Sequence, residues 1–310
     1  MNLLITGAFK GNDSFYQELR SLGYELFFFQ DEKSSLEDFG IDPSLIDGVI
    51  CNALFLYTDI KDFKSLKFIQ LTSAGLDRIP LEYIKEHGIK LFNARGVYSI
   101  PMSEYAIAGV LQLYKKSYLF KTFQTEHKWE KQRDIIELYG KTICIVGCGS
   151  VGTECAKRFK AFGCKILGLD VSAFDNAEFD KIYPIERAND VFRKSDIVVL
   201  TLPLTDKTVH FINRDELSFM KSGAILVNIS RGKVVNEYDL IQALQNNLGG
   251  AVLDVFEEEP LNKKSPLWDM PNVIITPHNS FIGDGNEKRL RSSIIKNIIE
   301  ITPNKDRGNR

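Results

Sequence analysis

Three residue types that together can handle a carboxylated carbonyl compound follow three apolar runs in the second half of the sequence. Arg231 follows "AILVNIS", an acidic cluster ending at Glu259 follows "AVLDVF", and His278 follows "NVIITP". A guanidinium group can hold a carboxylate through two parallel hydrogen bonds. A histidine can pass a proton near neutral pH, and a neighbouring carboxylate can orient its ring and favour its charged form. These residues therefore indicate proton-coupled chemistry on a small carboxylated substrate.

Each of these residues also has a purely structural interpretation. A histidine taken singly is more often a loop or capping residue, an acidic run usually forms a solvated face, and Arg231 could bond the carboxyl end of a helix. What favours catalysis is that all three come after one nucleotide-type loop, at the strand ends where open α/β sheets bind their ligands.

That loop is the stretch "VGCGSVG", residues 146–152, which stands between an apolar strand-like run and a helix-like segment. In this pattern Gly147 forms a tight turn, Gly149 lets a pyrophosphate approach the backbone, and Gly152 lets the helix pack on the strand. Ser150 and Val151 complete the predicted phosphate-binding loop.

Asp170 ends the next apolar run, "KILGLD", 18 positions after the last glycine of the loop. An acidic side chain at that place can bond both ribose hydroxyls of a dinucleotide. Val171 and Ser172 follow, and neither offers the arginine that would hold the 2′-phosphate of NADP. The sequence therefore predicts NAD(H) as the cofactor.

The elements that must position these residues form two successive α/β units. In the first hundred residues, strand-like runs at 2–6, 24–29, 47–51, 67–71 and 89–93 alternate with helix-like segments at 12–23, 42–47 and 80–88. An apolar helix is predicted over 99–124, with Pro101 in its first turn, and further strand-like runs lie at 196–202, 224–230, 250–256 and 272–277. A last helix at 286–301 could fold back on the first unit. The pattern predicts the α/β class, with parallel sheets.

Composition narrows the function classes. The 310 residues are 44% hydrophobic, and 39 lysines and arginines face 41 acidic residues, a formal charge of −2. Such a balance gives no reason to expect a nucleic-acid or membrane partner. The opening "MNLLITGAFKG" has no basic leader, so we expect a cytoplasmic protein.

The five cysteines, at positions 51, 144, 148, 155 and 164, lack metal-ligand spacing, so no metal site is predicted and buried thiols are expected. A redox role for Cys148 stays open.

Seven segments of the sequence, some of which contain the residues discussed above, resemble those of a known protein family. They are "LTSAGLD", "NARGVYSIPMSEYAIA", "ELYGKTICIVGCGSVG", "LPLTDKT", "LVNISRGKVVNEYDLIQAL", "LDVFEEEP" and "PLWDMPNVIITPH". In this order the chain resembles the D-isomer-specific 2-hydroxyacid dehydrogenases over nearly its whole length. The resemblance implies two Rossmann-like or flavodoxin-like, doubly wound parallel-sheet domains with a cleft between them. It implies a discontinuous substrate domain at 1–98 plus 281–310 and an inserted NAD-binding domain at 99–280, which would explain why the glycine loop lies in mid-chain.

The resemblance also implies catalytic roles. Arg231 would bind the substrate carboxylate and carbonyl oxygen, His278 would exchange a proton with that oxygen, and Glu259 would pair with His278. Backbone amides at Ala74 and Gly75 would cradle the same carboxylate.

Further roles concern the cofactor and the departures from the family pattern. Asp254 would contact the nicotinamide carboxamide, Thr201 would lie on the adenine side where relatives often carry histidine, and Pro203 would be another NAD contact. Arg95 and Tyr98 would either touch a substrate side chain or hold a hinge. The residues after His278, "NSFIG", predict a more polar pocket than in many relatives.

The function expected on these grounds is that of an NAD-dependent (R)-2-hydroxyacid dehydrogenase working as a 2-ketoacid reductase. A homodimer is expected, through the helix at "SIPMSEYAIA" and the arm at "HKWEKQRDIIELY". Two alternatives stay open. One is an NAD-sensing binding protein of the corepressor type, and the other is a phosphite dehydrogenase, which uses the same arginine, glutamate and histidine.

Overall fold

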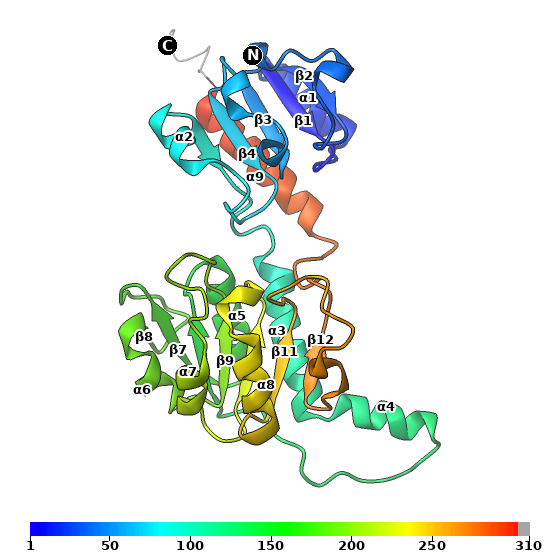
Figure 1. Cartoon of the computed structure of the whole chain (residues 1–310), viewed down its shortest axis with the longest axis vertical. Coiled ribbons are helices and arrows are strands. Elements are labelled where there is room, and N and C mark those ends of the chain that lie inside the picture. The colour runs from blue at the N-terminus through cyan, green and yellow to red at the C-terminus, as the bar shows by residue number, and fades with distance from the viewer. Residues whose placement is uncertain (303–310) are drawn as a thin grey trace. The chain divides into compact units, whose positions relative to one another are not determined.

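The computed structural model describes residues 1–302, and the chain divides into two compact units (Figure 1). The first unit comprises Met1–Tyr98 together with the residues from Gly283 on, and the second comprises Ser99–Ile282. An extended partner-binding tail would favour the corepressor alternative, and the polar segment "TPNKDRGNR" at 302–310 lies almost wholly outside the described residues. Within residues 1–302, no helix combines the length and the apolarity that a membrane crossing requires.

The first unit is built on a five-stranded parallel sheet in the order β2-β1-β3-β4-β5, which is the flavodoxin-like order. Its strands are β1 (Asn2–Thr6), β2 (Glu25–Phe29), β3 (Gly48–Cys51), β4 (Phe68–Leu71) and β5 (Lys90–Phe92). Its helices are α1 (Asp13–Ser21), α2 (Leu81–Glu86) and α9 (Asn286–Ile301). Strands β3 and β4 are buried along their whole length, as expected for a parallel sheet covered on both faces.

The predicted helix at 286–301 is confirmed, and it packs on the sheet formed by the N-terminal residues. Leu290, Ile294 and Ile298 recur every four residues, so they line one face of α9, and all three are buried in the same core as Leu3. The predicted helix at 42–47 is wrong. Only a short 3₁₀ turn, Pro43–Leu45, forms there, because the chain enters β3 three residues later.

The second unit contains a seven-stranded parallel sheet in the order β12-β11-β10-β9-β6-β7-β8. Its strands are β6 (Thr142–Val146), β7 (Lys165–Asp170), β8 (Lys181–Pro184), β9 (Ile197–Leu200), β10 (Ile225–Asn228), β11 (Gly250–Leu253) and β12 (Val273–Ile275). Strand order reverses between β6 and β9, which makes the sheet doubly wound. The predicted fold class is therefore confirmed for both units.

Helices cover this second sheet. They are α3 (Ser99–Tyr114), α5 (Ser150–Ala161), α6 (Ala188–Phe192), α7 (Arg214–Phe219) and α8 (Glu237–Asn246). Helix α3 lies close on the sheet, since a Cβ atom on Gly109 would come within 2.5 Å of a Val252 methyl carbon.

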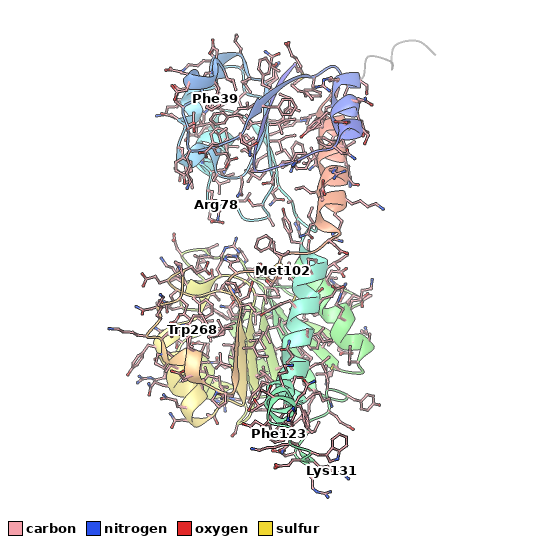
Figure 2. The ribbon with its side chains drawn as sticks, turned by 90° about the vertical axis from the view of Figure 1, so that its right-hand side faces the viewer. Phe39, Arg78, Met102, Phe123, Lys131 and Trp268 are labelled. Atoms are coloured by element: carbon pink, nitrogen blue, oxygen red, sulfur yellow. The ribbon has the colours of Figure 1, made fainter. Side chains whose placement is uncertain are left out.

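The single helix predicted over 99–124 is interrupted. It ends at Tyr114, Lys116 adopts a left-handed conformation with φ 51°, and α4 (Ser117–Thr125) begins directly afterwards. Helix α4 buries none of its residues. We call residues 117–139 the arm, which includes the segment 127–139 that was expected to form a dimer contact. Figure 1 shows the arm extending from the rest of the second unit, and Phe123 and Lys131 on it are labelled in Figure 2.

Candidate active site

The glycine loop lies where the strand order of the second sheet reverses. It follows β6, whose neighbour on one side is β7 and on the other β9. In open α/β sheets, ligands bind at the carboxyl ends of the strands at such a point. Gly147 has a φ of 93°, and a Cβ atom on Gly152 would come within 2.1 Å of the Gly147 carbonyl oxygen. Both positions therefore require glycine, for the turn and for the helix contact that the sequence predicted.

The loop fits the pyrophosphate of a dinucleotide. Helix α5 begins at Ser150, and its N-cap residue is Gly149, which has no side chain to cap the helix. A Cβ atom built on Gly149 would meet nothing within 4 Å, so the space in front of the helix N-terminus is open. Amide groups and the helix dipole at this end favour an anion. Ser150 and Val151 form the first turn of the helix.

Asp170, the predicted ribose ligand, is the last residue of β7 and is fixed to the loop. One carboxylate oxygen accepts a 2.7 Å hydrogen bond from the Cys148 amide, and the other accepts a 2.8 Å bond from the Val171 amide. The carboxylate therefore has a defined position beside the turn before any ligand binds.

Thr201 and Pro203 follow β9 on the other side of the turn. The Thr201 hydroxyl donates a hydrogen bond of 2.6 Å to the Gly147 carbonyl oxygen. The Pro203 carbonyl oxygen accepts a 2.7 Å bond from the Thr208 hydroxyl. Thr201 thus ties β9 to the glycine loop, a role that the sequence analysis did not foresee. The predicted contacts of both residues with NAD stay predictions.

Glu259 and His278, which lie 19 residues apart in sequence, form a hydrogen-bonded pair. His278 Nδ1 is 2.8 Å from Glu259 Oε2, and the other oxygen of the same carboxylate accepts a bond of 3.2 Å from the Phe256 amide. Both side chains are partly exposed, His278 at 40% and Glu259 at 38%. With Nδ1 held by the carboxylate, Nε2 is the ring nitrogen that can exchange a proton with a substrate.

Arg231 follows β10, and its loop touches the loop that carries Glu259. A Cβ atom on Gly232 would lie only 1.8 Å from the Phe256 carbonyl oxygen, so the two backbones are in direct contact. The Asn228 side chain donates a 3.1 Å hydrogen bond to the Arg231 carbonyl oxygen. One guanidinium nitrogen of Arg231 donates a 2.8 Å hydrogen bond to the Ser230 carbonyl oxygen. These bonds hold the Arg231 backbone next to the loop that carries Glu259.

Asp254 is fully buried and organises the turn that carries His278. Its backbone oxygen accepts a 2.8 Å bond from the His278 amide. Its carboxylate accepts bonds of 2.7 Å from the Asn279 amide and 2.9 Å from the Ser280 amide. The only signal of this role in the residues around Asp254 is an acidic residue directly after a fully apolar strand. The predicted contact of Asp254 with the nicotinamide stays a prediction.

Ala74 and Gly75, the predicted carboxylate cradle, lie in the first unit, in the connection from β4 to α2. The Asn93 side chain donates a 2.7 Å bond to the Ala74 carbonyl oxygen, and the Ser73 hydroxyl donates a 3.1 Å bond to that of Gly75. These bonds fix the loop, and its role in substrate binding stays a prediction.

Tyr98 was predicted either to touch substrate or to hold a hinge. Its hydroxyl donates a hydrogen bond to the Thr72 carbonyl oxygen at the end of β4, and burial raises the pKa of its phenol. This bond lies within the first unit, and both predicted roles of Tyr98 stay predictions. Arg95 donates its backbone amide to the Asn93 side chain at 3.2 Å.

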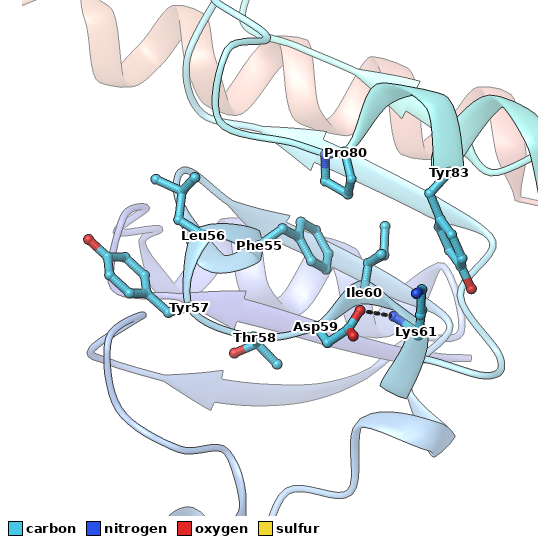
Figure 3. A pocket seen from close by; sticks show the side chains of 9 residues that line it. All are labelled: Phe55, Leu56, Tyr57, Thr58, Asp59, Ile60, Lys61, Pro80 and Tyr83. Atoms are coloured by element: carbon cyan, nitrogen blue, oxygen red, sulfur yellow. Dashed lines mark hydrogen bonds between the residues drawn. The ribbon is translucent and has the colours of Figure 1, made fainter.

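A pocket of about 340 Å³ lies in the first unit, beyond the carboxyl end of β3 (Figure 3). Its lining residues are Phe55, Leu56, Tyr57, Thr58, Asp59, Ile60, Lys61, Pro80 and Tyr83. None of the predicted site residues is among them, so we assign this pocket no part in the chemistry.

Residues 107–280 match a family model described as "D-isomer specific 2-hydroxyacid dehydrogenase, NAD binding domain". The matched segment is more than half of the chain. It contains the glycine loop, Asp170, Arg231, Glu259 and His278.

Relatives at the level of the whole chain agree with the family match. A glyoxylate reductase of Pyrococcus horikoshii is 34% identical over 243 residues, which cover 76% of this chain and 72% of the relative. A D-3-phosphoglycerate dehydrogenase of Methanocaldococcus jannaschii is 34% identical over 257 residues, which cover 78% of this chain, yet the chain spans only 49% of that relative. The crystal structure of D-lactate dehydrogenase from Aquifex aeolicus, complexed with NAD and lactic acid, is similar with a TM-score of 0.77 at 26% identity, covering 96% of this chain and 94% of that one.

Proposed function

The chain belongs to the D-isomer-specific 2-hydroxyacid dehydrogenase family of NAD-dependent oxidoreductases, and we propose that it reduces a small 2-ketoacid to the (R)-2-hydroxyacid. One observation carries the proposal. The histidine–glutamate pair, with His278 Nδ1 at 2.8 Å from Glu259 Oε2, stands beside the Arg231 loop in the same sheet that bears the glycine turn. The groups proposed as proton donor, carboxylate binder and cofactor site are therefore all carried by loops of one sheet.

Arg231 binds the substrate. A guanidinium group offers a planar pair of N–H donors that matches a carboxylate, and its charge is independent of pH in the physiological range. Held in this way, a 2-ketoacid presents its carbonyl group to the neighbouring histidine. The arginine charge also stabilises the negative charge that develops on the carbonyl oxygen during reduction.

His278 supplies the proton. Bound NADH supplies the hydride that reduces the carbonyl carbon. The carbonyl oxygen takes its proton from His278 Nε2, which leaves a neutral ring that solvent protonates again. Glu259 holds Nδ1 and stabilises the charged ring before the transfer. In the oxidative direction the neutral ring accepts the hydroxyl proton.

Asp170 sets the preference for NAD over NADP. Its carboxylate is anchored by a hydrogen bond of 2.7 Å from the Cys148 amide. It can therefore accept hydrogen bonds from the ribose hydroxyls, and it would repel a 2′-phosphate at the same place. Val171, which follows, is 83% exposed and carries no charge to offset that repulsion.

The arm is the part of the second unit that we assign to a homodimer contact. Its exposed large apolar side chains are Tyr118, Phe120, Trp129, Ile136 and Tyr139. Trp129 is 97% exposed, which is unusual for a large aromatic residue. A second copy of the same arm would supply a self-complementary apolar surface.

Five buried thiols fit a reducing compartment, and we place the protein in the cytoplasm.

The proposal is tested by following NADH oxidation with a series of 2-ketoacids, from glyoxylate and pyruvate to hydroxypyruvate and phenylpyruvate. Turnover of one of them should fall about a hundredfold or more in His278→Asn and by about tenfold or more in Glu259→Gln. Binding of NADH, measured by its fluorescence, should not change in either variant. Tight NADH binding without turnover of any ketoacid would contradict the proposal and favour a cofactor-sensing protein, and NAD reduction by phosphite would favour a phosphite dehydrogenase.

A further inference from the structure

The turn that carries His278 has an unfavourable backbone conformation. His278 has a φ of 51°, in the left-handed region that residues other than glycine rarely adopt. Such a conformation is unfavourable and persists only where surrounding contacts enforce it. Three consecutive amides, those of residues 278, 279 and 280, donate to Asp254. Asp254 is therefore the group that holds this turn.

A second pair of residues fixes the Asp254 carboxylate. The Thr276 hydroxyl lies 2.6 Å from Asp254 Oδ1, and the Tyr105 hydroxyl, from helix α3, is hydrogen-bonded to the Thr276 hydroxyl. An ionised carboxylate only accepts hydrogen bonds, so the single Thr276 proton must go to Asp254. Tyr105 must then donate to Thr276.

The resulting relay has one direction, from Tyr105 through Thr276 to Asp254. Burial raises the pKa of the Tyr105 phenol, the Thr276 bond opposes this effect, and the Asp254 charge adds to it. The phenol consequently keeps its proton and remains a donor. The Asp254 carboxylate is the only charge that this chain of hydrogen bonds requires. It is completely shielded from water, and hydrogen bonds are stronger in such a buried environment than in water.

We propose that Tyr105 is a positioning residue of the reaction, which acts through Thr276 and Asp254 to set where His278 Nε2 points. The proposal rests on the proposed function, because it assigns His278 the proton transfer. Within residues 1–302, the Tyr105 hydroxyl is hydrogen-bonded to Thr276, which in turn bonds to Asp254. Because the proposed route to the histidine runs through the hydroxyl of Thr276, the proposal is testable.

The first experiment compares Tyr105→Phe, Thr276→Val and the double variant. Removing the phenol hydroxyl should lower kcat by about threefold to tenfold, and removing the threonine hydroxyl by about tenfold to a hundredfold, since small misplacements of a catalytic group are costly. KM for the ketoacid and binding of NADH should stay close to those of the unaltered enzyme. The double variant should be no slower than Thr276→Val alone, because Tyr105 has no route to His278 without Thr276.

Several controls separate positioning from packing. Thr276→Ser keeps the hydroxyl and should restore most of the activity. Tyr114→Phe removes a hydroxyl from the same helix, outside the relay, and should leave kcat unchanged. The solvent isotope effect on kcat should rise in Tyr105→Phe, because a displaced histidine makes proton transfer slower than the other steps. Additive losses in the double variant, or an unchanged isotope effect, would overturn the proposal.

Failure of the proposed function is distinguishable from failure of this inference. If the unaltered enzyme turns over no ketoacid, the proposed function is wrong. Amide hydrogen exchange at Asn279 and Ser280 still reports on the relay in that case. Protection of these two amides should fall in Thr276→Val and, less strongly, in Tyr105→Phe. Unchanged protection in both variants would show that the relay does not hold the turn.

Discussion

The backbone amide of His278 donates a 2.8 Å hydrogen bond to the backbone carbonyl oxygen of Asp254. Strands β11 and β12 end at Leu253 and Ile275, and they pair in parallel up to those residues. The bond therefore continues the contact between the two strands past their ends. The turn that carries His278 is thereby tied directly to the end of the sheet, which is a more rigid support than an isolated loop.

Arg231 should be distinguishable from a simple positive charge. Arg231→Ala should lower kcat/KM for the ketoacid by about a hundredfold or more, because the carboxylate loses both hydrogen bonds. Arg231→Lys keeps the charge but not the planar pair of donors, so it should recover only part of that loss. Steady-state kinetics on both variants measures the difference. Equal activity of the lysine variant and the unaltered enzyme would contradict a two-bond contact.

Asp170 should control the choice of cofactor. In Asp170→Ala, NADH should bind about tenfold more weakly, while NADPH binding should weaken less or improve, because the repulsion of the 2′-phosphate is removed. Fluorescence titration of both cofactors gives the ratio of the two dissociation constants. Asp170→Asn is the matched control, since it keeps the size of the side chain and removes its charge. An unchanged ratio in both variants would show that Asp170 does not read the ribose.

The arm should determine the oligomeric state. The enzyme is expected to run as a dimer in light scattering, and Trp129→Ala should raise the dimer dissociation constant by about tenfold or more, because a large apolar residue leaves the contact. Trp268, also in the second unit and 51% exposed, lies outside the arm. Trp268→Ala should leave the mass unchanged. A monomeric enzyme, or a dimer insensitive to Trp129, would place the contact elsewhere.

Asp196 should make the stability of the second unit depend on acid. Burial by itself would raise the pKa of this carboxyl, but the Thr142 amide at 2.8 Å and Lys221 at 2.9 Å hold it below its ordinary value of 3.8. A lowered pKa in the folded state stabilises above the unfolded pKa, and this contribution is lost as the pH falls through the folded pKa. Asp196→Asn should therefore lower the free energy of unfolding by about 1 kcal/mol near neutral pH and by progressively less below about pH 4.

Urea unfolding of Asp196→Asn at several pH values checks this expectation. Asp175→Asn serves as the control, because Asp175 is exposed and its loss should change the unfolding midpoint little at any pH. A destabilisation of Asp196→Asn that is equally large in acid and at neutral pH would show that lost packing, and not lost charge, is responsible.

The cysteines should be inert in the native enzyme. All five are buried, and burial, with the Asp170 charge adding to it, raises the pKa of the Cys148 thiol to about 12. Thiolate is the reactive form, so an aromatic disulfide reagent at neutral pH should modify none of the five until the chain is unfolded. Rapid modification of Cys148 in the folded enzyme, prevented by Cys148→Ser, would revive the redox role that the sequence left open.

Much of the site could be predicted from the sequence, because its signals are local. Gly147 and Gly152 are required by backbone geometry within a few residues, and Asp170 follows at a spacing set by one helix and one strand. The alternation of apolar runs with helix-like segments likewise determined the α/β class and the helix at 286–301. These features depend on side-chain size, polarity and spacing along the chain, which the sequence states directly.

Other features depended on which strands become neighbours and in what register. Tyr105, Thr276 and Asp254 are up to 171 residues apart in sequence, yet their hydrogen bonds form one relay. Nothing in the residues around Tyr105 indicates Thr276 as its partner, since a hydroxyl bonds whatever acceptor the packing brings within reach. The break of the helix at Lys116 could not be predicted either, because apolar residues continue on both sides of it. The sequence by itself determined the chemistry available to this protein, and the tertiary structure decided which groups hold that chemistry in place, because hydrogen-bond partners are chosen by distance in space.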